Sequence, residues 1–203
     1  MDMIREELST ICNEQNINLQ LKKKKKDMKR VVTKIGHVFC AEIEGKYKCY
    51  LQFVAVDGTQ LGGSVIRVFK THYPMDYKPN LDEIVKDDVD FYAHVMLNNG
   101  VREGIWYRVG KHQDLGDIEN IMFRQYKDSE FYYDKHGIPQ IRETSEWWIW
   151  KINQDFIDIG AELPNEYRSL PEGSVFPYTY IIRKIKTGHF NPLGSGDYKI
   201  MGD

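Results

Sequence analysis

The largest group of chemically active side chains in the sequence is a set of carboxylates between residues 76 and 90. Six acidic residues stand there against the two lysines Lys78 and Lys86. Neighbouring carboxylates can form the solvated face of a helix, where negative charge near the N-terminus is favourable. They can also steer and select a basic partner, because complementary charge raises association rates. Both interpretations stay open, and the second gives these candidate partner-binding residues: Asp82, Glu83, Asp87, Asp88 and Asp90.

The segment from Glu146 to Trp150 is dense in aromatic rings. Alternation along a strand would place Trp148 and Trp150 on one face and Trp147 and Ile149 on the other. One face must be core, because large aromatic side chains are mostly buried. The other face either lies under a helix or serves as an interface anchor. Trp147 therefore joins the candidate partner-binding residues.

Residues that often catalyse reactions or bind metals lack suitable neighbours here. His37 and Cys40 resemble half of a metal site, but positions three apart in a strand face opposite sides, and no second pair follows at zinc-site spacing. His94 lies in an apolar strand, where a hydrogen-bonded structural histidine is the ordinary explanation. We therefore expect no catalytic residue, no metal site and no cofactor. An enzyme that gathers His94 with the carboxylates of residues 87–90 remains an alternative.

The run of lysines at residues 22–26 is the strongest local positive charge. Like charges repel one another and resist packing, so such a run is typical of an exposed connector. It could instead bind nucleic acid, since each lysine near a phosphate releases counterions. The run contains no aromatic residue to stack on bases, and the formal net charge of the chain is −2, which favours the connector. A nucleic-acid-binding module that uses Lys22–Lys26 is kept as the main alternative function.

Length and composition set the broad class of protein. The chain has 203 residues, of which 41% are hydrophobic and 29% charged, as in an ordinary globular domain. It contains no stretch of about 18 consecutive apolar residues, and its start lacks the features of a signal peptide. Three cysteines, an odd number, favour free thiols in a reducing compartment. We therefore expect a cytoplasmic protein that does not associate with membranes.

Hydrophobic periodicity predicts an α+β fold with a strongly bent, mainly antiparallel sheet or a partly open barrel and a few short helices. The connections between predicted strands are too short for parallel crossovers. Residues 98–100 are predicted to form a turn. Helices are predicted at residues 1–15, at 81–88 after a capping Asn80, and at 178–187. Strands are predicted at residues 39–43, 47–55, 64–70, 89–97, 104–110, 118–124, 147–153 and 156–159.

The first two predicted strands form a β-hairpin around Gly45. A left-handed glycine at that position would pair Glu42 with Lys46. Alternation along the strands would place Cys40 and Cys49 on opposite faces, so no disulfide is expected between them.

The domain organisation predicted from these patterns has three parts. Residues 1–21 are an N-terminal helix and lead-in, residues 22–34 are a basic connector, and residues 35–203 are a single β-rich α+β domain.

The segment from Lys34 to Leu61 resembles the opening of the immunity protein 26 family of bacterial polymorphic toxin systems. In that pattern a basic stretch leads into a strand, a glycine-containing turn and a tyrosine-rich returning strand. The residues that carry the resemblance are Lys34, Gly36, Phe39, Gly45, Tyr47 and Tyr50. The resemblance continues more faintly through residues 91–106 and 147–153. It implies a cytosolic, non-catalytic protein that binds a cognate toxin, such as a nuclease with a basic substrate cleft, in equal stoichiometry.

Overall fold

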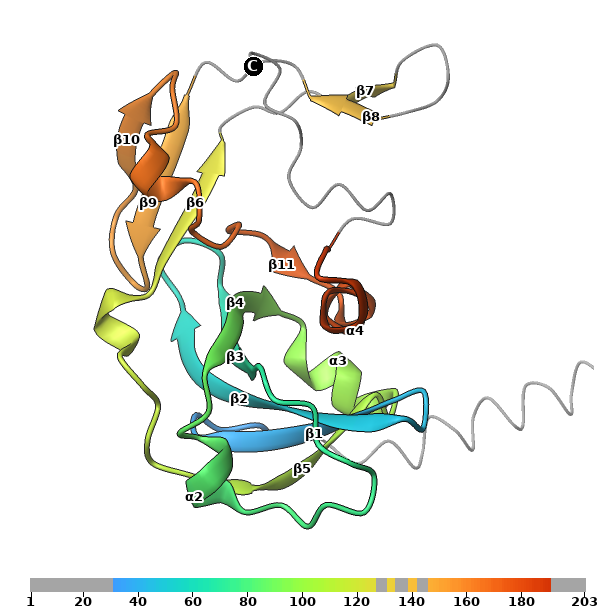
Figure 1. The fold of residues 1–203 in the computed structure, drawn as a ribbon. Helices are drawn as coiled ribbons and strands as arrows, with labels where there is room; N and C mark the ends of the chain where they lie inside the picture. The colour runs from blue at the N-terminus through green and yellow to red at the C-terminus, as the bar shows by residue number, and fades with distance from the viewer. Residues whose placement is uncertain (1–30, 127–130, 134–138, 142–145, 191–203) are drawn as a thin grey trace, which may run out of the picture. The chain divides into compact units, whose positions relative to one another are not determined.

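A computed structural model describes residues 31–126, 131–133, 139–141 and 146–190 of the chain. Its main feature is a six-stranded sheet with the strand order β11-β4-β3-β2-β1-β5 (Figure 1). Neighbouring strands are antiparallel except for β11, which pairs parallel to β4. The strands are β1 His37–Ile43, β2 Tyr47–Asp57, β3 Gly63–Phe69, β4 Val89–Val95, β5 Trp106–Lys111 and β11 Val175–Phe176.

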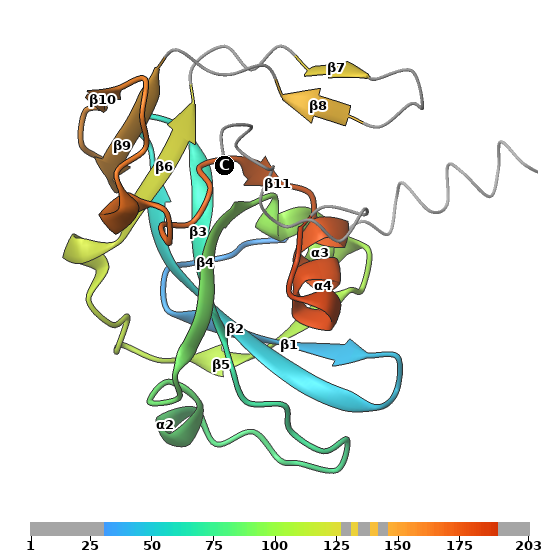
Figure 2. The same cartoon turned by 45° about the horizontal axis from the view of Figure 1, so that its top comes forward.

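A smaller sheet of three strands, in the order β10-β9-β6, packs beside the ends of β2, β3 and β4 (Figures 1 and 2). Its strands are β6 Met122–Tyr126, β9 Trp147–Lys151 and β10 Ile157–Gly160. A separate pair is formed by β7 Phe131–Tyr133 and β8 Pro139–Ile141. Short 3₁₀ turns are η1 Ile118–Asn120 and η2 Asn165–Tyr167.

Both faces of the six-stranded sheet are covered, which explains its nearly continuous apolar strands. On one face, Phe39 and Leu51 pack with α3 Leu97–Arg102 and α4 Tyr178–Thr187. On the opposite face, Cys40 and Tyr50 pack with Ile84 of α2 Leu81–Ile84. The predicted α+β class, with a mainly antiparallel bent sheet and a few short helices, is therefore confirmed, and neither sheet closes into a barrel. Irregular register in β2 after Phe53 is one source of the bend.

The predicted first hairpin is present, but its register differs by two residues. Glu44 and Gly45 both have positive φ angles, of 52° and 66°, and Lys46 N–H donates to the Ile43 carbonyl at 2.9 Å. Ile43 therefore pairs with Tyr47, and Glu42 pairs with Lys48 instead of Lys46. The error arose because the turn begins at Glu44 and not at Ile43. A shift of two residues leaves each side chain on its predicted face.

The cysteines in this hairpin follow the prediction. Cys40 faces the α2 side of the sheet, Cys49 faces the α4 side, and both are buried free thiols. Burial raises the pKa of each of these thiols, so their thiolate forms are disfavoured.

The turn predicted at residues 98–100 is wrong, because those residues lie within α3. Gly100 allows this helix to lie directly against Trp106: a Cβ atom there would be 2.2 Å from the indole ring. The Trp106 indole N–H also donates to the Leu97 carbonyl at 3.1 Å. These tertiary contacts override the local turn preference of the Asn-Asn-Gly sequence.

Two other predicted helices are present. The helix α2 is shorter than predicted, and Asn80 precedes it without a side-chain capping hydrogen bond. The helix α4 matches its predicted range and ends at Gly188, which has a φ of 78°. The predicted helix at 1–15 and the lysines at 22–26 lie outside the described residues, so the proposed division at residues 21 and 34 stays a prediction.

Candidate interaction surface

The carboxylates predicted to bind a partner are carried mainly by α2 and the residues that follow it. Ile84 and Val85 are 0% and 3% exposed, and they pack against the sheet beside Cys40 and Tyr50. Because one side of this short helix is buried, Asp82 and Glu83 face solvent. Burial of the apolar pair therefore fixes the direction in which the acidic side chains point.

Hydrogen bonds hold several of these carboxylates in place. The Asp82 carboxylate lies 3.0 Å from His112 Nε2, and the Tyr77 hydroxyl donates to Glu83 at 3.1 Å. Burial and the bond to Glu83 raise the pKa of Tyr77, so this hydroxyl stays protonated. Asp87 accepts hydrogen bonds from the backbone N–H groups of Thr71 and Asp88, at 2.9 and 2.8 Å.

The negative charge of these side chains is oriented but not neutralised. Within the described ranges, neither Asp82, Glu83 nor Asp87 forms an ion pair with a lysine or an arginine. The carboxylate of Asp82 is 82% exposed. Such side chains remain available to basic groups of a partner, and their orientation reduces the entropy lost on binding.

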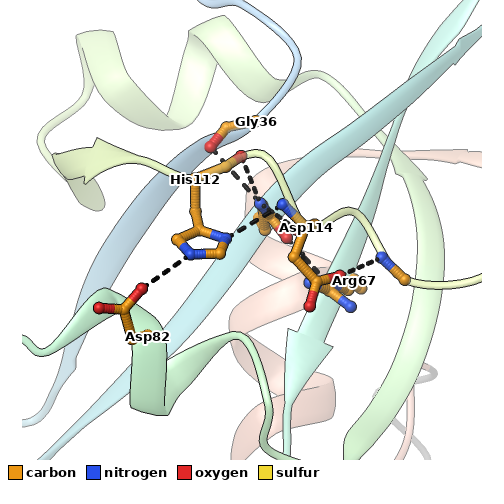
Figure 3. A network of polar contacts seen from close by, with 7 residues as sticks. Gly36, Arg67, Asp82, His112 and Asp114 are labelled. Atoms are coloured by element: carbon orange, nitrogen blue, oxygen red, sulfur yellow. Dashed lines mark hydrogen bonds and ion pairs between the residues drawn. The ribbon is translucent and has the colours of Figure 1, made fainter.

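A polar network beside α2 connects this helix to the sheet (Figure 3). His112 lies between Asp82 and Asp114, and its Nδ1 accepts the Asp114 backbone N–H at 3.1 Å. Its other ring nitrogen, Nε2, therefore carries the hydrogen that is donated to Asp82. The Asp114 carboxylate in turn accepts the Gly116 N–H at 2.8 Å. His112 thus links α2 to the loop that follows β5.

Two buried polar side chains anchor that loop from below. Arg67 and Gln52 are opposite one another on β3 and β2, and the Arg67 Nε donates to Gln52 Oε1 at 2.8 Å. The Arg67 Nη2 and the Gln52 Nε2 both donate to the Asp114 carbonyl, at 2.9 and 3.0 Å. The Arg67 guanidinium also stacks on Phe69 at 5.0 Å. The acidic surface therefore rests on a buried, hydrogen-bonded support.

Replacement of Arg67 by methionine is expected to reduce the free energy of unfolding by about 2 kcal/mol, because Gln52 and the Asp114 carbonyl lose their buried charged donor. Urea unfolding followed by circular dichroism measures this change. The exposed Arg108 gives a matched control, and Arg108→Met should change stability by less than about 0.5 kcal/mol. Equal effects of the two substitutions would contradict the supporting role of Arg67.

The remaining predicted partner-binding residues lie apart from this network. Asp88 is exposed just before β4, and Asp90 is exposed within that strand. Trp147 belongs to β9 in the other sheet, where it is 7% exposed and contacts Arg124 and Tyr126. The structure therefore does not bring Trp147 together with the carboxylates, and little of its ring is accessible.

The sequence interpretation missed His112, Asp114, Arg67 and Gln52. Gln52 and Arg67 each interrupt an apolar run in strands predicted to be neighbours, which is a signal for a buried polar pair. His112 and Asp114 carry no such signal, because they are far from α2 in the sequence and come close to it only in the folded protein.

The alternative enzyme hypothesis required His94 to lie close to the carboxylates of residues 87–90. Its hydrogen-bond partner is a different carboxylate, that of Asp57. Its Nε2 lies 3.0 Å from Asp57 Oδ2, and both side chains are 0% exposed. Asp57 Oδ2 also accepts the Trp150 indole N–H at 2.9 Å, and Asp57 Oδ1 accepts the Asn153 backbone N–H at 3.1 Å. These contacts form a buried link between the two sheets. Asp57 and Trp150, which take part in it, are 93 positions apart in the sequence.

His37 and Cys40 occupy opposite faces of β1: the His37 ring lies edge-on to Phe39, while Cys40 belongs to the α2 side. In the described part of the chain, no group of three or more His, Cys, Asp or Glu side chains could hold a metal ion. The described helices are all too short or too polar to cross a membrane.

Comparison with models of known protein families gives a match. The family model described as Immunity protein 26 matches residues 34–132, just under half of the chain. The matched range includes α2, His112 and Asp114, and it ends before β9, β10, β11 and α4. Comparisons with curated proteins and with solved structures gave no match. The match confirms the family resemblance that was predicted from the first hairpin.

Proposed function

We propose, because residues 34–132 match the model of the immunity protein 26 family, that the chain binds a cognate toxin protein and neutralises it without catalysing a reaction. The toxin is a partner that the family implies. We further propose that the protein acts in the cytoplasm of a bacterium, in agreement with its free cysteines.

The observation that supports a specific binding surface is the oriented, unneutralised negative charge around α2. We propose that Asp82, Glu83, Asp87, Asp88 and Asp90 face a basic region of the toxin. A toxin that acts on nucleic acid, such as a nuclease, needs a positively charged substrate site. An acidic surface that occupies or shields such a site would block substrate binding, and charge complementarity would accelerate capture of the toxin.

Reversal of the charge at Asp82, Glu83, Asp87 and Asp88 to lysine is expected to weaken toxin binding by at least about a hundredfold, because attraction at the interface becomes repulsion. Binding of the unmodified protein should also weaken as salt is added. Calorimetry or surface plasmon resonance with the purified toxin measures both effects.

A matched control reverses four exposed carboxylates elsewhere on the chain, namely Glu103, Glu119, Asp155 and Glu162. This variant carries the same change in net charge as the α2 variant but leaves the proposed surface intact. It should therefore retain most of the affinity for the toxin. Circular dichroism of both variants verifies folding. Unchanged toxin binding by the α2 variant would exclude this surface.

The toxin is identified by capture of the tagged full-length protein from its native cells, followed by mass spectrometry and a test for bound nucleic acid. A toxin held in equal stoichiometry is the expected result. Recovery of nucleic acid, lost on replacement of Lys22–Lys26 by glutamine, would instead support a nucleic-acid-binding module and contradict the proposed function.

A further inference from the structure

The junction between the two sheets depends on contacts around Asp57. Asn153, which follows β9, accepts the Gly58 N–H at 2.8 Å and donates to the Val56 carbonyl at 2.9 Å. Gln60 donates to the Gln154 carbonyl at 2.9 Å. The apolar part of the junction joins side chains from both sheets and the chain between them: Val54, Ala55, Val65, Ile121, Phe123 and Trp150.

His94 is the titratable histidine at this junction, and only one of its two ring nitrogens has a hydrogen-bond partner among the described residues. Its Nε2 donates to Asp57 Oδ2, the same oxygen that binds the Trp150 indole. Its Nδ1 is buried and has no hydrogen-bond partner among the described residues. The ring packs against Phe123, with the centroids 4.2 Å apart. A proton added to Nδ1 would therefore be a buried donor without an acceptor.

The surroundings of His94 offer limited compensation for such a charge. Asp57 on β2 is the titratable group that acts on it, while the rings packed against it from β6 and β9 are the uncharged Phe123 and Trp150. Its partner in the register on β11 is the uncharged Val175. Burial lowers the pKa of His94, although Asp57 opposes this effect. Burial alone would raise the pKa of Asp57, but hydrogen bonds from Trp150, His94 and Asn153 hold it below its usual value.

We propose that His94 is an acid-sensitive latch, whose protonation releases the three-stranded sheet from the six-stranded sheet while the latter stays folded. A charged ring is disfavoured among the uncharged side chains that surround it in the closed junction. Opening of the junction removes this cost, because the new proton then reaches water. The effect is centred on β6 and β9, because Phe123 and Trp150 are the side chains of the smaller sheet that contact His94.

The sign of the pH dependence follows from the lowered pKa. His94 favours the closed junction fully above its ordinary pKa of 6.5, and this contribution is lost as the pH falls from 6.5 toward the lower value in the folded protein. Between pH 7.5 and pH 5.5, the opening equilibrium should therefore increase by up to about tenfold, the effect of one proton taken up by an open site.

Hydrogen exchange of the full-length protein at pH 7.5 and pH 5.5, corrected for intrinsic exchange rates, tests this proposal. The amides of β6 and β9 should open up to about tenfold more often at the lower pH, while those of β1, β2 and β3 keep their protection. In His94→Gln, whose amide nitrogen can still donate to Asp57 but does not titrate, the additional opening should disappear.

Three results would overturn the proposal. The first is the same pH dependence in His94→Gln as in the unmodified protein. The second is equal loss of protection in both sheets, which indicates global unfolding. The third concerns the unmodified protein and applies even if the variant does not fold. It is a His94 ring that nitrogen NMR finds protonated at pH 5.5 while the β9 amides stay protected.

Discussion

Replacement of Asp57 by alanine is expected to lower the free energy of unfolding by about 3 to 5 kcal/mol, because the three donors around this buried carboxylate would lose their acceptor at a cost of about 1 to 3 kcal/mol each. The Asp57 carboxylate accepts hydrogen bonds from His94, from the Trp150 indole and from the Asn153 backbone. His94 and Trp150 are both fully buried, so water cannot replace the lost acceptor without opening the junction. Chemical unfolding monitored by tryptophan fluorescence measures the loss.

Two further substitutions make this experiment specific. Asp57→Asn retains the shape of the side chain and one acceptor oxygen, so it should lose less stability than Asp57→Ala. The exposed Asp117 hydrogen-bonds Asn120 at 2.8 Å, and Asp117→Ala should cost less than about 1 kcal/mol. A loss below about 1 kcal/mol in Asp57→Ala would contradict the assigned role of this buried link.

The second large effect is expected at Gly173, where substitution by alanine should cost about 3 kcal/mol or more through overpacking. A Cβ atom at this position would lie 1.8 Å from the ring of Trp150, which is itself 0% exposed. The Gly173 N–H also donates to the Arg124 carbonyl at 2.9 Å, so its backbone cannot move away freely. The indole would have to shift, and its bond to Asp57 would be disturbed.

Gly58 provides the matched control for this substitution. A Cβ atom there would have Asn153 Oδ1 at 3.8 Å as its nearest neighbour, which is an ordinary contact. Gly58→Ala should therefore change the free energy of unfolding by less than about 1 kcal/mol. Thermal and urea unfolding of the two alanine variants give the comparison, and similar stabilities would show that the Trp150 ring tolerates a shift.

The fold could be predicted where neighbouring residues carry the information. Alternation gives the β1–β2 hairpin, and the helical spacing of Ile181 and Ile185 gives α4 together with its end at Gly188. The helix α3 could not be predicted in this way. Its Asn-Asn-Gly sequence favours a turn locally, and only the contact of Gly100 with Trp106 shows why a helix forms.

Part of the candidate surface could likewise be predicted from neighbouring residues, and part of it could not. The carboxylates of α2 are adjacent in the sequence, so the sequence alone predicts a local concentration of negative charge. The groups that orient and support them come from β2, β3 and the loop after β5. Contacts such as that between His112 and Asp82, 30 positions apart, depend on how the sheet brings distant segments together. A single sequence contains no periodic signal for them.

The position of β11 and α4 in the chain has a consequence for the order of events during synthesis. These elements come last among those described, yet Phe176, Ile181 and Ile185 cover the apolar face formed by β1 to β4. A nascent chain that has emerged only as far as residue 132 exposes the part of that face that β11 and α4 cover, because these elements have not yet been made. Long-range pairing of this kind slows folding, and apolar surface that is exposed in the meantime favours aggregation. Under the proposed function, toxin binding would therefore begin only after translation has passed α4.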